Sequence, residues 1–278
     1  KAELLLQEGD LAKSLEWLDH ARQMQPDDVD VENLSVRAML SALRKDFAAN
    51  QNLLPELEDL IYWPADRVEL IKLQVRASLQ RSDAVDAIER LIELSQLVSR
   101  EPALASVSRG VHDDSSRHVS LDGWLSARVH ESADIATDEQ VAEIDRMIDE
   151  YLKDYVGAST PTVKRLLVHF GSQAGAQSLT MKLLDRYRDD GAFLAMERLV
   201  LGATHATTES SDRLEPWQRE VLAEIYARGG LLPDAAAMLS KIDPSKDTGR
   251  LVEQMVLSAD EIAKLSTSNQ VTKWGQYV

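Results

Sequence analysis

Residues 9–21 read GDLAKSLEWLDHA, and this stretch shows the pattern that runs through most of the chain. Its apolar residues Leu11, Leu15 and Leu18 have the spacing that places side chains on one face of a helix. Gly9 is typical of the chain's few glycines and prolines, which mostly stand between such segments. Runs of β-branched residues that alternate with polar ones are nearly absent. The sequence therefore predicts an all-α fold.

Helix boundaries are marked by single residues. Thr137 and Gln140 have the spacing of a capping box, in which side chains bond the free amides of the first turn. Pro161 and Pro216 suit the first helical position, where no amide hydrogen is needed. Because the connections are short, neighbouring helices should pack as consecutive antiparallel hairpins. We expect helices at about 1–7, 10–24, 30–43, 46–61, 66–80, 83–99, 121–133, 138–155, 160–170, 175–189, 192–204, 216–228, 232–241 and 259–265.

The composition limits the class of protein. The 278 residues include 47 acidic and 31 basic side chains, a net charge of −16, and no cysteine. This balance argues against a nucleic-acid partner, because phosphate binding needs clustered Lys and Arg. The lack of cysteine excludes disulfides, thiolate metal sites and cysteine nucleophiles. No apolar run approaches the roughly 20 residues of a membrane-spanning helix. We expect a soluble protein of the cytoplasm or periplasm that inserts into no membrane and needs no cofactor.

The opening stretch resembles the second half of a tetratricopeptide repeat. In that family a Gly-Asp turn joins two antiparallel helices, a small residue five positions later lets them approach, and a proline ends the unit. Gly9, Leu18, Ala21 and Pro26 fall at the corresponding places, and Ser14 stands where the family usually has alanine. The resemblance implies an array of antiparallel helical hairpins, an α-solenoid wound as a right-handed superhelix.

Further copies recur along the chain. The fullest covers both helices of a hairpin from Leu222 to Leu239, and another surrounds Gly191. Weaker copies are centred on residues 45–47 and on 82–83. The turn positions 9, 45, 82, 191 and 230 are separated by 36, 37, 109 and 39 residues, so a near-constant period returns after an irregular middle. The alternative is a nonrepetitive helical bundle.

Residues 164–255 are also similar in texture to helical regions of large bacterial proteins that carry PQQ-type β-propeller repeats elsewhere. This resemblance rests on the Phe170-Gly171 turn and on the hairpins at Gly191 and at Gly230. It implies that Gln270–Val278 leads into a neighbouring domain. One alternative function is therefore structural, with the helices packing on a propeller of the same parent chain.

The periodicity fails between Ala103 and Ser120, where serine, aspartate and glycine gather. A loop of that length is uncommon within a compact domain. We therefore expect N-terminal hairpins over 1–102, an irregular linker over 103–120, C-terminal hairpins over 121–269 and a tail over 270–278. Since the chain begins at Lys1 and shows no secretory signal, it is expected to be a fragment or a processed product.

Two regions could carry chemistry. His112, His118 and His130 lie near acidic residues, and imidazole with carboxylate suits zinc, manganese or iron. A metal-dependent enzyme or sensor is therefore a second alternative, although the spacing matches no ligand pattern and solvated loop histidines are the better explanation. Acids also crowd residues 138–154, but the apolar stripe there predicts a solvated acidic face rather than a catalytic pair; this stripe is Val141, Ile144, Ile148, Leu152 and Tyr155.

The resemblance also suggests a binding surface. In tetratricopeptide arrays the first helix of each hairpin lines a concave groove that holds a peptide or a partner helix. On this basis Glu69, Lys72 and Arg76 should line the groove, and the neighbouring helix should add Ser35 and Met39. Lys72 and Arg76 are four positions apart and can face one carboxylate of a partner. The alternative is an ordinary surface salt bridge from Glu69 to Lys72 or Arg76.

Motifs for catalysis are missing. The sequence has no phosphate-binding glycine loop, no serine nucleophile elbow and no zinc-protease helix motif. We therefore predict a non-catalytic interaction or scaffold module that binds a peptide, a helix or a neighbouring domain. No small-molecule substrate is expected.

Overall fold

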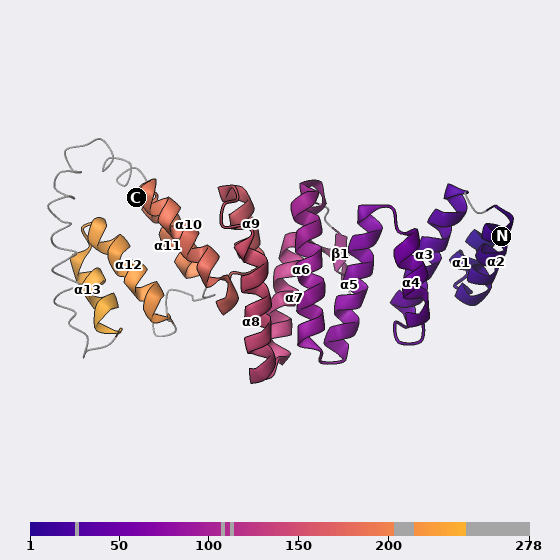
Figure 1. Cartoon of the computed structure of the whole chain (residues 1–278), viewed down its shortest axis with the longest axis horizontal. Coiled ribbons are helices and arrows are strands. Elements are labelled where there is room, and N and C mark those ends of the chain that lie inside the picture. The colour runs from indigo at the N-terminus through magenta and orange to yellow at the C-terminus, as the bar shows by residue number, and fades with distance from the viewer. Residues whose placement is uncertain (26–27, 107–108, 112–113, 203–213, 243–278) are drawn as a thin grey trace. The chain divides into compact units, whose positions relative to one another are not determined.

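The computed structural model describes residues 1–25, 28–106, 109–111, 114–202 and 214–242. Nearly all of this backbone is helical, which confirms the all-α prediction (Figure 1). The chain divides into two compact units, Lys1–Ser178 and Leu179–Val278, called here the N-terminal and C-terminal units. None of the described helices is both long enough and apolar enough to cross a membrane.

The N-terminal unit holds most of the described helices, and several pack against the next helix along the chain, among them α1 on α2, α2 on α3 and α5 on α6. In Figure 1, α5 and α6 lie side by side, and α6 also packs against α7 and α8. The elements are α1 (Ala2–Gln7), α2 (Leu11–Met24), α3 (Val29–Lys45), η1 (Gln51–Leu53), α4 (Leu54–Leu60), α5 (Pro64–Gln80), α6 (Ala84–Arg100), η2 (Pro102–Ser106), β1 (Arg109–Val111), β2 (Asp114–Val119), α7 (Leu121–Ile135), α8 (Asp138–Lys153), α9 (Thr160–Phe170) and η3 (Ala174–Ala176).

The C-terminal unit contains the remaining described helices. Helix α10 begins at the end of the N-terminal unit, and α12 packs against both α11 and α13. Arg188 of α10 forms two bonds of 2.9 Å with the carboxylate of Glu224 on α12. The elements are α10 (Gln177–Asp189), α11 (Phe193–Gly202), α12 (Pro216–Arg228) and α13 (Leu232–Ser240). The helix expected at 259–265 and the tail at 270–278 lie outside the described residues.

The capping signals explain several helix starts. Thr137 and Gln140 form the expected capping box at the start of α8. Asp10 and Asp83 accept backbone amides in the first turns of α2 and α6. These side chains satisfy amides that have no partner within the helix.

Four of the expected turn positions share one backbone geometry. Each has a positive φ, which is strained for residues other than glycine, and the next residue donates its amide to the carbonyl five positions earlier, at 2.8–2.9 Å. This bond closes the C-terminus of the preceding helix. The positive-φ residues are Gly9 (79°), Ser82 (58°), Gly191 (67°) and Gly230 (78°).

The middle segment differs from the expected irregular linker. Residues 109–111 and 114–119 form an antiparallel pair of short strands, with Arg109 opposite Val119 and Gly110 opposite His118. The chain divides after Ser178 and not within 103–120, since α6 packs against α7 and α8 across this segment.

The helix expected over 46–61 is also different. The backbone turns after α3, passes through η1 and begins α4 only at Leu54, with Pro55 in its first turn. Asn50 holds this break, since its Nδ2 donates to the carbonyl oxygens of Ala42 (3.1 Å) and Asp46 (2.7 Å). The break brings Phe47 and Leu54 against the core cluster around Met39 and Leu57.

Candidate functional site

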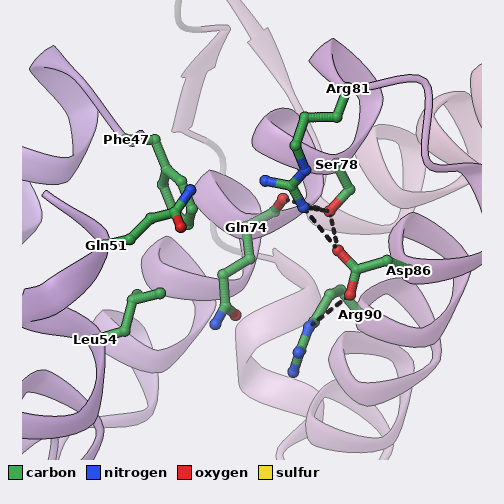
Figure 2. Close-up of a pocket in the computed structure, with 8 residues that line it drawn as sticks. All are labelled: Phe47, Gln51, Leu54, Gln74, Ser78, Arg81, Asp86 and Arg90. Atoms are coloured by element: carbon green, nitrogen blue, oxygen red, sulfur yellow. Dashed lines mark hydrogen bonds and ion pairs between the residues drawn. The ribbon is translucent and has the colours of Figure 1, made fainter. Parts of the chain in front are cut away.

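A pocket of about 310 Å³ opens in the N-terminal unit between the α3–α4 connection and the helices α5 and α6. Figure 2 shows its two unlike walls, with the Gln74 side chain between them. One wall is formed by Phe47, Gln51 and Leu54, and the other by Ser78, Arg81, Asp86 and Arg90. The volume is at the small end of ligand pockets, which suits one or two side chains of a partner.

Asp86 organises the polar wall. Its carboxylate accepts from the Ser78 hydroxyl and lies 3.3 Å from Nη2 of Arg81. Its other oxygen lies 3.6 Å from Nε of Arg90. Asp86 also stands in the first turn of α6, where a negative charge complements the helix dipole. One carboxylate therefore holds two guanidinium groups at the pocket edge.

Gln74 lies at the base of the pocket and is only 8% exposed. Its Nε2 lies 3.5 Å from a carboxylate oxygen of Glu58 on α4. Its Oε1 is buried and has no hydrogen-bond partner among the described residues. Buried polar groups are nearly always bonded, so this acceptor is the most unusual atom of the pocket.

The residues of α5 that were expected to line a groove do not line this pocket. Glu69 is buried and paired with Arg44 of α3 at 3.2 Å and with Lys72 at 3.8 Å. The Lys72 ammonium lies 5.4 Å from the ring centroid of Trp124, and Arg76 is exposed. The structure thus contains the ion pair between Glu69 and Lys72 that the sequence offered as the alternative.

Ser35 and Met39 do not line an open groove. Ser35 is fully buried, and its hydroxyl donates to the carbonyl of Val31 at 2.8 Å. Met39 is 1% exposed and belongs to the core cluster. Both side chains are enclosed because α3 packs against α2, α4 and α5, so neither is available to a partner in this structure.

The pocket opens on the other side of α5 from the expected groove. Because each helical residue advances by about 100°, Gln74 and Ser78 point away from Glu69, Lys72 and Arg76. The sequence offered one sign of this face, since Gln74 and Ser78 interrupt a run of apolar residues that are otherwise buried.

The structure does not bring the three histidines considered for a metal together among the residues it describes. His112 lies outside the described residues, and only the backbone of His118 is described. Nδ1 of His130 bonds the Ser126 carbonyl at 2.8 Å within α7. Among the described residues, no three His, Asp or Glu side chains are grouped as metal ligands.

Most acids of α8 lie on the expected solvated face, while Asp145 is half-buried and accepts the Gly175 amide at 2.9 Å. Arg146 pairs with Glu143 at 2.7 Å and with Glu150 at 3.2 Å, all on the surface of one helix. The buried stripe is Ile144, Ile148, Tyr151 and Leu152. Val141, in the first turn of α8, was expected in this stripe but is 40% exposed.

A second polar cluster lies in the core of the N-terminal unit. Nδ1 of His169 on α9 lies 3.0 Å from the Ser95 hydroxyl on α6, and Nε2 lies 2.8 Å from Oδ1 of Asp122 on α7. The Tyr151 hydroxyl on α8 donates to Ser95 at 3.1 Å. Burial raises the pKa of Tyr151, which keeps this donor protonated. The cluster joins four helices.

The residue types of this cluster are those of a serine hydrolase triad, but its geometry is closed. Ser95 and His169 are fully buried, and the hydroxyl of Tyr151 donates a hydrogen bond to the serine oxygen. A nucleophile must reach a substrate carbonyl and have an oxyanion site beside it. Within the part of the chain that the structure describes, the hydrogen bonds of the Ser95 oxygen are with Tyr151 and His169. The histidine between Val168 and Phe170 in an apolar helix was the one sequence sign of the cluster.

Comparison of the chain with protein-family models, with curated proteins and with solved structures found no match.

Proposed function

We propose that the chain is a non-catalytic protein-interaction module that holds a peptide segment of its partner in the pocket beside Gln74. The observation that carries this proposal is the pocket itself, whose apolar wall of Phe47 and Leu54 faces a polar wall centred on Asp86. Such a pairing suits a peptide, which offers an apolar side chain next to polar groups.

The proposed scaffold is a tetratricopeptide-like array of antiparallel helical hairpins. The four positive-φ turns support it, because Gly9, Ser82, Gly191 and Gly230 close helices with the same backbone bond. Two of them, Gly191 and Gly230, are 39 positions apart, close to one repeat. Arrays of this kind expose broad surfaces to partners.

A non-catalytic role is also supported by the second cluster. Ser95 and His169 have the chemistry of a nucleophile and a base, yet both are buried in the core and hydrogen-bonded to other core side chains. Their role in the proposal is to hold α6 against α7, α8 and α9, and α6 carries Asp86 and Arg90 of the pocket.

The experiment selects peptides from a displayed random library on the full chain and then compares two variants. Gln51→Trp places a large side chain at the pocket wall. Asn52→Trp adds the same side chain at the next exposed position, which does not line the pocket. We expect selected peptides to bind the wild type and Asn52→Trp equally and Gln51→Trp about tenfold or more weakly, since the tryptophan displaces the ligand.

Two results would contradict the proposal. One is a selection that yields no peptide dependent on residue 51. The other is equal binding to Gln51→Trp and Asn52→Trp, which would place the binding surface elsewhere.

A further inference from the structure

The side-chain amide of Gln74 has a partner for its nitrogen, while its oxygen has no hydrogen-bond partner among the described residues. Its Nε2 faces the Glu58 carboxylate at 3.5 Å. Turning the amide over would place its oxygen against that carboxylate, which is repulsive, so Glu58 sets the orientation. The oxygen is therefore the end left toward the pocket, where Figure 2 shows the amide between Leu54 and Arg90. A buried acceptor without a donor raises the free energy of the unliganded state.

The cations of the pocket are already balanced. Arg81 and Arg90 share Asp86, and Nη1 of Arg90 lies 3.5 Å from Glu93. Glu93 in turn bonds Arg67 at 2.5 Å. An anionic ligand would have to displace these carboxylates and would meet Glu58 near the base. A neutral ligand avoids both costs.

The guanidinium groups still have donors to offer. An arginine carries five N–H groups, and the contacts of Arg90 with Asp86 (3.6 Å) and Glu93 (3.5 Å) are made by Nε and Nη1. The opposite wall of Phe47 and Leu54 offers contact to a methylene stem. A ligand group that complements the pocket is therefore neutral and combines a hydrogen-bond donor, an acceptor and a short apolar stem.

We infer that the pocket receives a primary amide side chain, glutamine or asparagine, from the partner segment. The amide donates one N–H to Oε1 of Gln74, and its carbonyl accepts from a guanidinium N–H of Arg90. Its stem lies against Leu54 and Phe47. This inference rests on the proposed function and names the chemistry that the same pocket selects.

The test titrates the full chain with three capped single residues of similar shape. The probes are the N-acetyl, N-methylamide forms of glutamine, glutamate and methionine, and NMR follows the side-chain amide of Gln74. We expect the glutamine probe to bind about three- to tenfold more tightly than the other two, the value of one or two added hydrogen bonds. The comparison is made on the wild type and needs no variant to fold.

Two variants then assign the preference. Gln74→Met removes the acceptor with little change of volume, and Gln80→Met makes the same change at an exposed site on α5. We expect Gln74→Met to bind the glutamine and methionine probes equally and Gln80→Met to keep the preference for glutamine.

The inference is overturned if the glutamate or methionine probe binds as tightly as the glutamine probe, or if none binds. The proposed function fails separately. If library peptides depend on residue 51 but lack glutamine and asparagine, the peptide-binding function is supported and the amide preference is wrong. If the glutamine probe is preferred but no library peptide depends on residue 51, the amide site is supported and the peptide-binding function is wrong.

Discussion

Oδ1 of Asp122 lies 2.8 Å from Nε2 of His169, although 47 positions separate the two residues. The bond joins the first turn of α7 to the last turn of α9, and Ser95 and Tyr151 extend it to α6 and α8. Because the imidazole is fully buried, each of its nitrogens needs a partner. The cluster therefore fixes how four helices pack.

Replacing Ser95 by alanine should lower the free energy of unfolding by about 1–3 kcal/mol, since it leaves Nδ1 of His169 and the hydroxyl of Tyr151 short of a partner. Ser41→Ala is the matched control, because the half-buried Ser41 donates to the Arg37 carbonyl of its own helix at 2.8 Å and joins no other helix among the described residues. It should change stability by about 0.5 kcal/mol or less. Urea unfolding of the full chain measures both. Equal losses would mean that the cluster does not stabilise the packing.

Tyr151 should make the protein sensitive to alkali. Burial raises the pKa of its hydroxyl above the ordinary value of 10.0. Above that value the unfolded chain loses this proton and the folded chain keeps it, so stability falls as the pH rises. Tyr151→Phe should reduce the stability lost between about pH 8 and about pH 11 by about 1 kcal/mol. Tyr62→Phe, at a side chain 83% exposed, is the control and should leave the loss unchanged.

Asp86→Asn should change which probe the pocket prefers. The substitution removes the charge that balances Arg81 and Arg90, so an anion can bind these guanidiniums directly. The glutamate probe should bind this variant about fivefold or more tightly than it binds the wild type. Asp59→Asn removes a charge at an exposed site of α4 outside the pocket and should have little effect. An unchanged affinity for glutamate in both variants would show that Asp86 does not set the charge of the pocket.

The positive-φ turns predict opposite effects at two positions. Ser82 adopts a φ of 58°, so Ser82→Gly should raise the free energy of unfolding by about 0.5 kcal/mol. Gly191 adopts 67° in the equivalent turn, and Gly191→Ala should lower it by about 1 kcal/mol. Gly202→Ala is the control, because Gly202 ends α11 without a positive φ and has open space around it. Thermal unfolding measures the three. A loss of stability in Ser82→Gly would contradict the turn argument.

The sequence predicted most helices because their signals are local. Thr137 and Gln140 are three positions apart, and Asp10 and Asp83 cap helices that begin beside them. The strands at 109–111 and 114–119 were missed, since their serines, aspartate and glycine are also typical of loops. The break before α4 was missed although two residues mark it, since asparagine, as at Asn50, favours turns, and Pro55 suits the first turn of a new helix.

The sites depend on residues that no local pattern connects. Ser95 and His169 are 74 positions apart, and Gln74 meets Glu58 across 16. The expected groove followed the family register on α5, and its Glu69 is instead used to pair with Arg44. The pocket on the other face of α5 exists because the chain between α3 and α4 does not continue as one helix. Interruption of an apolar stripe, as at Gln74 and His169, is the one sequence feature that marks both sites.

Site-specific photo-crosslinking shows directly whether a peptide binds in the pocket beside Gln74. A benzophenone amino acid is placed at position 51 or at position 52 of the full chain, and a selected peptide is irradiated with each. We expect crosslinks from position 51, with the attachment beside a glutamine or asparagine of the peptide, and little product from position 52. Equal yields from the two positions would contradict binding in the pocket.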